Sequence, residues 1–369
     1  MTSDRLSIAF FGSSIVSAYW NGAATYYRGI VRALSELGHR ITFYEPDAYG
    51  RQEHRDIDDP DWCRVEVYEA TRAAVDRQLE TAATSDVIVK ASGVGVFDEY
   101  LEKALPRLKR PDNMIVFWDV DAPATLARME ADPEDPFRSS VSQYDQLLTY
   151  GGGEPVVEAY RGFGARSCIP IYNALDTTTH FPVPPRERFR ADLAFLGNRL
   201  PDREARVEDF FLTPARQLPD KRFIIGGSGW GDKSMPDNVD YLGHVYTADH
   251  NAFNSTPLAV LNVSRDSMAS TGFSPATRVF EAAGAGACMI TDYWQGIEQF
   301  FVPDEEILVA KNGEEVTDIL SKLDPARARR IGDAAYKKVL ERHTYADRAD
   351  RVQEIFTNFF SHREAYQPG

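Results

Sequence analysis

An arginine and a glutamate three residues apart, Arg278 and Glu281, have the spacing that places both side chains on one face of a helix. A helix start lies just upstream, because Ser274 suits the N-cap and Pro275 the first helical position. A helix N-terminus binds phosphate through its unpaired N–H groups and its partial positive charge. Arg278 could add a bidentate clamp to that phosphate, and Glu281, one turn deeper, could accept two hydroxyls of a ribose. The alternative is an ion pair within the helix and no ligand.

A strand that ends in a Gly-Asn-Arg turn offers a second set of candidate ligand contacts. Residues 193–196 are apolar and are followed directly by Gly197, Asn198 and Arg199. The glycine allows close approach of the backbone to a ligand. The arginine would lie at the carboxyl end of the strand, where open α/β sheets bind ligands. Arg203 follows on the next helix. The alternative is a solvated helix start whose acidic neighbours balance both arginines.

A glycine-rich loop, GGSGWG at residues 226–231, comes directly after another predicted strand. No window in it fits G-x-G-x-x-G, and the chain has no Walker A lysine loop, so neither nucleotide-binding fingerprint is present. The loop is either shaped for close backbone contact with a ligand or is a simple turn. Its candidate contacts are Gly227, Ser228, Gly229 and Trp230.

His244 follows the next predicted strand in the sequence LGHVY. In that position it is a candidate contact to a nucleotide base or to a sugar. The alternative is a partly buried histidine without a ligand.

The first half of the chain has aromatic and amide groups in the loop after its first strand, namely Tyr19, Trp20, Asn21 and Gly22. Aromatic rings provide large, flat contact surfaces and an amide can both donate and accept hydrogen bonds, so the loop could hold a sugar or another acceptor. The alternative is a surface loop capped by Asn21. Gly152 and Gly153 also follow a strand and could line the same side of the domain.

Asp119 and Asp121 form a D-x-D pair at the end of the predicted strand 114–118. Hard cations prefer oxygen ligands, so the pair could hold Mn²⁺ or Mg²⁺, although D-x-D often arises by chance. A second possibility is that Asp119 is the general base for an acceptor hydroxyl. A third is a helix cap and turn before Pro123.

Short apolar runs alternate with amphipathic segments, which predicts βαβ units and parallel sheets covered on both faces. In the first half a helix is predicted over 26–38 and strands over 6–11, 40–44, 86–90, 114–118 and 146–150. After a polar, proline-containing stretch the pattern restarts, with strands predicted over 192–196, 222–225, 239–242, 258–263, 287–291 and 306–309.

We therefore predict an α/β protein with two Rossmann-like domains facing across a cleft. The first domain is predicted over residues 1–172 and the second over 191–345, with a linker at 173–190. A last helix within 346–369 could cross back to the first domain.

The chain has 369 residues and a formal net charge of −15, which repels phosphate backbones and anionic lipid, so no nucleic-acid partner is expected. Its three cysteines, Cys63, Cys168 and Cys288, have the spacing of neither a disulfide framework nor a zinc site. No stretch approaches the roughly 20 apolar residues of a membrane-spanning helix, and the apolar run at the N-terminus is too short for a signal peptide. We expect a cytoplasmic protein that binds no metal and could be a homodimer.

Four motifs between residue 192 and roughly residue 348 resemble the nucleotide-sugar-binding domain of GT-B glycosyltransferases, in particular the CgeB-like (spore-maturation) branch. They are FLGNRLPDRE, GHVYTADHNAFN, GFSPATRVFEAAGAGACMITD and HTYADRADRV. The resemblance implies that Glu281 holds the ribose hydroxyls and that Arg199 contacts the diphosphate. Many retaining members have a second glutamate eight residues earlier, where this chain has Phe273, so the stereochemical outcome stays open. The first half resembles the family only in its βαβ pattern and in the loop after its first strand.

Together, the residues and the resemblance predict a metal-independent hexosyltransferase that uses a UDP- or TDP-linked sugar and an unknown small-molecule or glycan acceptor. Arginines and helix N–H groups would neutralise the departing diphosphate. The predicted donor contacts are Gly197, Asn198, Arg199, Arg203, Gly227, Ser228, Gly229, Trp230, His244, Phe273, Ser274, Arg278 and Glu281. The predicted catalytic residues are Asp119 and Arg278, and the acceptor-side residues are Tyr19, Trp20, Asn21, Gly22, Asp121, Gly152 and Gly153.

Three alternatives stay open at this point. A nucleotide-sugar epimerase would have the same two-domain architecture and would need no acceptor. A non-catalytic nucleotide-sugar-binding or structural protein would bind the donor without turnover. A metal-dependent enzyme of the GT-A type would use Asp119 and Asp121 as metal ligands.

Overall fold

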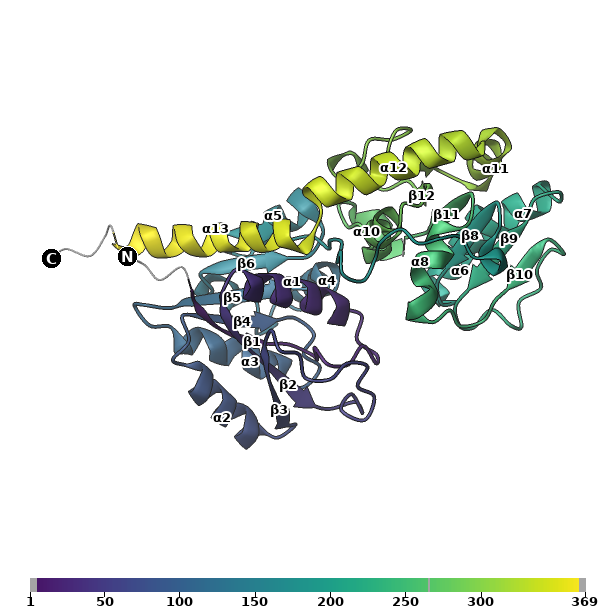
Figure 1. Cartoon of the computed structure of the whole chain (residues 1–369). Helices are drawn as coiled ribbons and strands as arrows, with labels where there is room; N and C mark the ends of the chain where they lie inside the picture. The colour runs from purple at the N-terminus through teal and green to yellow at the C-terminus, as the bar shows by residue number, and fades with distance from the viewer. Residues whose placement is uncertain (1–4, 265, 365–369) are drawn as a thin grey trace. The chain divides into compact units, whose positions relative to one another are not determined.

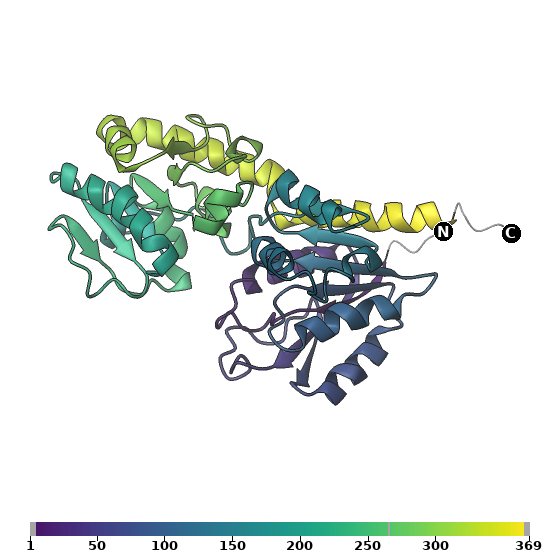
Figure 2. The ribbon, with the colours of Figure 1, turned by 180° about the vertical axis from the view of Figure 1, so that it is seen from behind.

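The computed structural model describes residues 5–264 and 266–364, which form two compact units (Figure 1). Unit 1 contains the described residues up to Tyr172 and those from Tyr345 onward, and unit 2 spans Asn173–Thr344. The last helix, α13 (Tyr345–Glu364), therefore belongs to unit 1, and Figure 1 and Figure 2 both show it lying along that unit. Gly29 makes room for it, because a Cβ on Gly29 would lie 2.3 Å from the Tyr345 ring.

Unit 1 is a seven-stranded parallel sheet in the order β3-β2-β1-β4-β5-β6-β7. The order reverses beside β1, and the carboxyl ends of the strands at such a switch point are where open α/β sheets bind ligands. The strands are β1 (Ser7–Phe11), β2 (Arg40–Asp47), β3 (Arg64–Glu69), β4 (Val87–Ala91), β5 (Met114–Asp119), β6 (Gln146–Thr149) and β7 (Cys168–Pro170).

Helices cover both faces of this sheet. One face packs on α2 (Arg72–Ala82), α3 (Asp98–Ala104), α4 (Ala122–Ala131) and α5 (Gly153–Gly162). The other face packs on α1 (Ala24–Glu36), where the rings of Phe10 and Tyr27 meet with their centres 5.6 Å apart. Short 3-10 turns occur at Leu105–Leu108 and Val141–Gln143.

Unit 2 is a six-stranded parallel sheet in the order β10-β9-β8-β11-β12-β13, which is the Rossmann order 3-2-1-4-5-6 when counted within the unit. The strands are β8 (Leu193–Leu196), β9 (Phe223–Gly226), β10 (Val239–Tyr241), β11 (Ala259–Asn262), β12 (Met289–Asp292) and β13 (Leu308–Ala310). The helices are α6 (Pro201–Val207), α7 (Thr213–Gln217), α8 (Thr247–Ser255), α9 (Asp266–Thr271), α10 (Thr277–Gly284), α11 (Gly313–Lys322) and α12 (Pro325–Arg342). A π turn at Glu208–Leu212 and 3-10 turns at Glu187–Phe189 and Ile297–Gln299 complete the unit.

Every strand predicted from the sequence is present, with its ends shifted by a few residues. Strands β3 and β7 were not predicted, because β3 is an edge strand in which charged residues alternate with apolar ones and β7 has only three residues. The stretch 173–190, predicted to be a linker, is part of unit 2, where Leu175 pairs with Thr344 in an isolated parallel bridge. None of the helices in the described residues is long and apolar enough to cross a bilayer.

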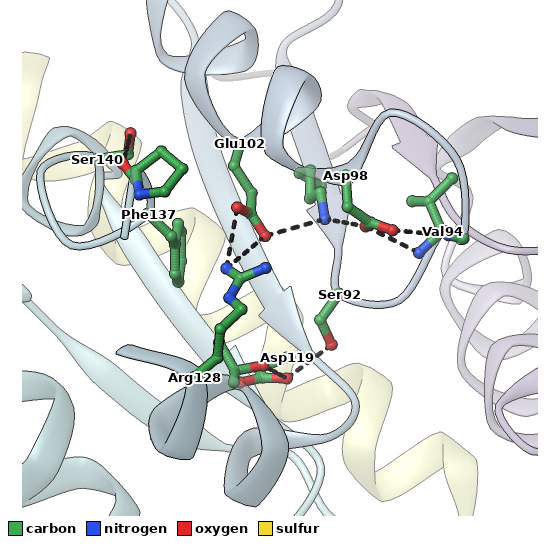
Figure 3. A network of polar contacts seen from close by, with 12 residues as sticks. Ser92, Val94, Asp98, Glu102, Asp119, Arg128, Phe137 and Ser140 are labelled. Atoms are coloured by element: carbon green, nitrogen blue, oxygen red, sulfur yellow. Dashed lines mark hydrogen bonds and ion pairs between the residues drawn. The ribbon is translucent and has the colours of Figure 1, made fainter. Parts of the chain in front are cut away.

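A network of buried charges lies near the carboxyl ends of β4 and β5 in unit 1 (Figure 3). The side chain of Lys90 in β4 has no exposed surface, and its ammonium group lies 2.6 Å from Asp98 and 3.6 Å from Glu102. Glu102 also pairs with Arg128 at 3.0 Å. Asp98 accepts the N–H groups of Val94 and its neighbour in the loop after β4. The network therefore holds that loop on the end of the sheet.

The Asp98 carboxyl has a pKa below its ordinary value. Burial raises this pKa, but the Lys90 charge and the hydrogen bonds from Lys90 and the loop N–H groups outweigh burial. The unfolded chain consequently binds a proton at Asp98 before the folded one does as the pH falls. Asp98 thus contributes stability that is present above about pH 4 and is lost below it.

We expect Lys90→Met to lower the free energy of unfolding by about 3 kcal/mol at pH 7, because buried carboxylates lose their cation. This penalty shrinks below about pH 4, where the contribution of Asp98 is lost from the native protein as well. Urea unfolding at both pH values measures the effect. Lys103→Met, an exposed lysine on α3, is the matched control. A penalty independent of pH, or an equal loss in the control, would contradict this account.

Candidate functional site

The loops after β8 and β9 lock together at the carboxyl edge of the unit 2 sheet. The Gly197 N–H donates to the carbonyl of Gly226, and the Ser228 N–H donates to the Asn198 side chain at 2.9 Å. Gly227 has a φ of 116°, and a Cβ there would lie 2.3 Å from the Gly197 carbonyl oxygen, so only glycine fits. The two glycine-containing loops noted in the sequence therefore form one surface.

Two of the predicted ligand contacts instead support this pair of loops. Trp230 is buried, and its indole N–H donates to the Gly197 carbonyl at 2.7 Å. Arg199 pairs with Glu204 at 2.8 Å and with Asp232 at 2.9 Å. Hydrogen bonds from Arg199 and then from a nearby lysine lower the pKa of the Glu204 carboxyl to about 2. The single donor of the Trp230 indole is already in use, so the structure does not support Trp230 as a ligand contact. The described hydrogen bonds of Arg199 use its Nη1 and Nη2 atoms and not its Nε, and its predicted contact with the diphosphate stays a prediction.

Arg278 lies in the first turn of α10 beside a second arginine. Its guanidinium carbon is 5.7 Å from the centre of the Phe195 ring in β8, and no hydrogen bond or ion pair joins it to the residues that the structure describes. The Nη1 atom of Arg203 would lie 2.9 Å from a Cβ placed on Gly197. Burial, followed by the nearby charge of Arg203, lowers the pKa of Arg278 to about 10. Two arginines gathered at the end of β8 are suited to binding an anion.

Glu281 lies one turn after Arg278 on α10 and is half-buried, near His250, which the sequence did not single out. Burial lowers the pKa of His250, and His180 and Arg278 add to that effect, whereas the hydrogen bond to Val245 and the charge of Glu281 oppose it. The ring of His250 contacts the Val245 carbonyl at 3.1 Å. No sequence signal links the histidines to the arginine, because His180 lies in the stretch taken for a linker and neither histidine directly follows a strand.

The helix that carries Arg278 begins later than predicted. It starts at Thr277 with Ala276 in the N-cap position, so the prediction that Ser274 caps it is wrong, and Pro275 precedes the helix. No side chain caps α10, so no capping side chain accepts a hydrogen bond from the first N–H groups of the helix. The helix start is therefore compatible with a bound anion, although the predicted cap by Ser274 is absent.

Phe273 occupies the turn before α10 and has a positive φ of 45°. Its N–H donates to the Gln295 carbonyl at 2.6 Å, and its ring lies where a Cβ on Gly296 would be only 2.1 Å away. Phe273 therefore joins the loops before α10 and after β12. Its predicted contact with the donor stays a prediction.

His244 is exposed at the carboxyl side of β10. Its ring is edge-on to that of Tyr246, with ring centres 4.7 Å apart and planes at 86°. The neighbouring Gly243 carbonyl accepts the Gly227 N–H, which ties this segment to the loop pair. His244 is thus exposed beside these loops, and its predicted contact with a ligand stays a prediction.

In unit 1, Asn21 is buried and uses its whole amide within its own loop. Its Nδ2 donates to the carbonyls of Ser14 and Ser17, and its Oδ1 accepts the Ser13 hydroxyl at 2.9 Å. Asn21 therefore has no amide group left for an acceptor, which contradicts its predicted role. Gly22 is exposed, and nothing lies within 4 Å of the place a Cβ would take, so no close approach requires a glycine there.

The remaining unit 1 candidates are two buried glycines and two exposed rings. Gly152 and Gly153 have φ values of 88° and 51° at the start of α5, and a Cβ on Gly152 would lie 2.0 Å from Val156. They form a buried turn and line no open surface. Tyr19 and Trp20 keep 41% and 83% of their surface exposed and so stay candidates for contacts with an acceptor.

Asp119 has no exposed surface, and its carboxylate accepts four hydrogen bonds within unit 1. Its Oδ1 accepts from the Ser92 hydroxyl at 2.6 Å, the Asp121 N–H at 2.9 Å and the Thr125 hydroxyl at 3.1 Å, and its Oδ2 accepts the Tyr160 hydroxyl. These contacts fit neither a general base nor a metal ligand. Asp121 stands at the N-cap position of α4 but makes no side-chain cap hydrogen bond, so the D-x-D pair marks the start of a helix without the predicted cap.

Comparison with known proteins gives a family for part of the chain. Residues 203–354 match the model of a glycosyl transferase-like family. Sucrose-phosphate synthase from Thermosynechococcus elongatus superposes with a TM-score of 0.69 and 14% identity, over 97% of this chain and 100% of that one. Anabaena HepE in complex with UDP-glucose gives 0.65 and 14%, over 96% and 100%. An α-glucosyltransferase in complex with UDP-glucose and DNA gives 0.69 and 13%, over 96% and 100%.

The fold is that of the GT-B glycosyltransferases. This confirms the prediction of an α/β chain with two Rossmann-like domains. No curated protein matches the chain in sequence. Within the GT-B fold, the glycosyl transferase-like match begins at Arg203 and includes Arg278 and Glu281, so it covers the residues that gather at the carboxyl edge of unit 2.

We expect Arg278→Met to leave the melting temperature unchanged or higher, because it removes a charge that faces Arg203 and pairs with no described carboxylate. Arg206→Met is the matched comparison, because Arg206 pairs with the fully buried Asp292. That variant should lose about 3 kcal/mol of stability. Thermal unfolding in phosphate-free buffer compares the two variants. An equal loss in both would show that Arg278 supports the fold.

Proposed function

We propose that this protein is a glycosyltransferase that takes a sugar from a nucleoside diphosphate sugar bound to unit 2. The observation that carries the proposal is Arg278, which lies beside Arg203 and is paired with no described carboxylate. A diphosphate brings the negative charge that such a pair attracts, and arginine binds phosphate oxygens with two parallel hydrogen bonds. The glycosyl transferase-like match over residues 203–354 supports the same assignment.

The arginines would also serve the reaction itself. Negative charge builds on the diphosphate as the bond to the sugar breaks, and fixed cations lower the energy of that state. Arg278, with Arg203 and the uncapped start of α10, is placed to provide this stabilisation without a metal. Metal independence is thus part of the proposal, and activity should persist when divalent cations are chelated.

Glu281 is the residue we assign to the ribose. It lies one helical turn from Arg278, it is half-buried, and no hydrogen bond from a described residue occupies its carboxylate. A carboxylate in that position can accept both ribose hydroxyls. HepE is seen in complex with UDP or UDP-glucose and the α-glucosyltransferase with UDP-glucose, so UDP is the first nucleotide to test, and a ribose contact favours UDP over TDP.

Unit 1 would present the acceptor. The CgeB-like relationship, a hexose as the transferred sugar and action in the cytoplasm belong to the same proposal. We assign no general base, because Asp119 is saturated with hydrogen bonds inside the fold.

Calorimetric titration with UDP, UMP and uridine tests the diphosphate assignment. The wild type should bind UDP most tightly, and Arg278→Ala should weaken UDP binding about 10- to 100-fold while changing uridine binding little. Arg330→Ala, an exposed arginine on α12, is the matched control and should leave UDP affinity unchanged. If Arg278→Ala bound UDP as tightly as the wild type does, Arg278 would not be a ligand of the diphosphate.

A second titration tests Glu281 with UDP and 2′-deoxy-UDP. The wild type should prefer UDP by about tenfold, and Glu281→Ala should bind both equally, because the variant lacks the carboxylate that accepts the 2′-hydroxyl. Glu314→Ala, an exposed glutamate on α11, should keep the wild-type preference. A preference for UDP that survives in Glu281→Ala would place the ribose elsewhere.

Product analysis separates the transferase from its alternatives. Incubation with UDP-sugars and no acceptor should leave the sugar configuration unchanged, whereas an epimerase would convert it. Turnover that requires Mn²⁺ would favour a metal-dependent mechanism instead. Donor binding without transfer to any acceptor would favour a binding protein.

A further inference from the structure

Three aromatic side chains of unit 1 stand exposed at the carboxyl edge of its sheet. Tyr19 and Trp20 belong to the loop after β1, and Tyr49 follows β2. Their exposed fractions are 41%, 83% and 58%. Folding leaves such large rings in water at a cost in free energy. We call these three residues the aromatic platform.

Two residues of the platform have a backbone conformation that aromatic residues rarely adopt. Trp20 has a φ of 47° and Tyr49 a φ of 58°, in the left-handed region that favours glycine. Neither ring is placed there to fill the core, because both are exposed. Strained, exposed rings of this kind cluster at functional sites, where the strain orients the side chain for a ligand.

A buried arginine beneath the platform holds its parts together. Arg51 keeps only 6% of its surface exposed, and its guanidinium donates to the carbonyls of Ser13, Val94 and Trp20 at 3.2, 3.3 and 3.5 Å. The same guanidinium lies 5.1 Å from the centre of the Tyr49 ring. Arg51 thus joins three loops of unit 1 and holds the Tyr49 ring relative to the Trp20 backbone.

The other supports are equally specific. The Tyr49 hydroxyl donates to the Gly95 carbonyl at 2.6 Å, and a Cβ on Gly95 would lie 2.8 Å from the Tyr49 ring, so a larger residue there would displace it. Tyr19 stacks on His54 with ring centres 4.1 Å apart and planes at 9°. Tyr19 and Tyr49 are therefore held by specific contacts, and the Trp20 ring lies edge-on to Tyr19 with ring centres 6.2 Å apart.

The rings and their surroundings match the chemistry of a sugar. A pyranose has a C–H face that packs on aromatic rings and hydroxyls around its edge that need hydrogen-bond partners. The loop that carries Tyr49 also contains Glu53, Asp58 and Asp61, whose carboxylates can accept hydrogen bonds from such hydroxyls. Asp56 and Asp59 are already paired, with Arg28 and Arg55, and Arg51 is buried. The loop carries a net negative charge, which would repel a polyanion.

We propose that the aromatic platform binds the acceptor and that this acceptor is a neutral saccharide. The inference rests on the proposed function, since it names the acceptor class of the same transfer. It excludes nucleic acid, the polymer present in the α-glucosyltransferase complex that shares the fold.

Glycine substitutions test the platform without disturbing the fold, because glycine suits a positive φ. Trp20→Gly and Tyr49→Gly should leave the melting temperature within a degree or so of the wild type, since removing strain opposes the loss of ring contacts.

With UDP-glucose as donor and short neutral oligosaccharides of glucose, galactose, mannose and xylose as acceptors, Trp20→Gly should raise KM for the acceptor about tenfold or more and leave the UDP affinity unchanged. Trp20→Phe should recover most of the loss. Val67→Ala, an exposed apolar residue on the edge strand β3, is the control.

Binding can also be followed without turnover. Trp20 is exposed, so its fluorescence should change when an oligosaccharide packs on it, and Tyr49→Gly should weaken that response while keeping the reporter. The same titration is run with a short DNA duplex. A response to DNA and not to any saccharide would overturn the inference.

The outcomes separate the two proposals. UDP binding together with a saccharide response that Trp20→Gly abolishes supports both. UDP binding with no response to any neutral saccharide, or with unchanged KM in Trp20→Gly, overturns the inference on the acceptor and leaves the donor site in place. Absence of UDP binding in the wild type overturns the proposed function itself.

Discussion

Electrostatic repulsion between Arg203 and Arg278 is the constraint on which the unit 2 site depends. Burial and the Arg203 charge lower the pKa of Arg278, and no described carboxylate pairs with it. Such an arrangement is unfavourable in the free protein and becomes favourable when an anion binds, so the free energy of binding is larger than for a site already neutralised. The backbone at Gly197 allows the two arginines to lie close together, because the absence of a side chain there leaves room for the Arg203 guanidinium. A side chain at Gly197 would push that charge away from the end of β8.

At the carboxyl edge of the parallel sheet in unit 1, the buried cation lies beside carboxylates and not beside another cation. Lys90 is fully buried and faces Asp98 and Glu102, so its charge is neutralised inside the protein. The energy gained there fixes the loop after β4, and through the Gly95 carbonyl it supports the Tyr49 ring. An edge whose buried charges are paired and whose rings are exposed suits an uncharged ligand, whereas an edge where Arg278 lies beside Arg203 suits an anion. The two Rossmann-like units thus differ in the chemistry of their carboxyl edges more than in their topology.

The sequence predicted the topology well because apolar runs and helix spacing are local signals. It also indicated which loops follow strands, and so brought Gly197, Gly227, Arg278 and Glu281 into consideration. The sequence could not show which polar side-chain groups are already hydrogen-bonded within the protein and so are not available to a ligand. Arg199 has the same residue type and nearly the same position as Arg203, yet only the structure shows that Glu204 and Asp232 hold it. Asn21 and Asp119 were overestimated for the same reason. The partners of Asp119 include Ser92 and Tyr160, which are distant in the chain, and those of Asn21 depend on how its own loop folds. His180 and His250 were missed because they are 70 positions apart in the chain.

The net charge of −15 and the arginine pair act over different distances, so they affect a small anion and a long polyanion differently. Salt screens charges on the surface beyond about 8 Å at physiological ionic strength, so a small diphosphate that reaches Arg278 is governed by the arginines beside it. A polyanion must also lie along the acidic surface outside the site, where repulsion accumulates with length. In the proposed transferase, this difference would favour small anions over polymers of the same chemistry. The acidic loop that carries Tyr49 would extend the selection to the acceptor, because carboxylates accept hydrogen bonds from hydroxyls and repel phosphates. Donor and acceptor would then be distinguished by charge before any contact specific to a base or a sugar is made.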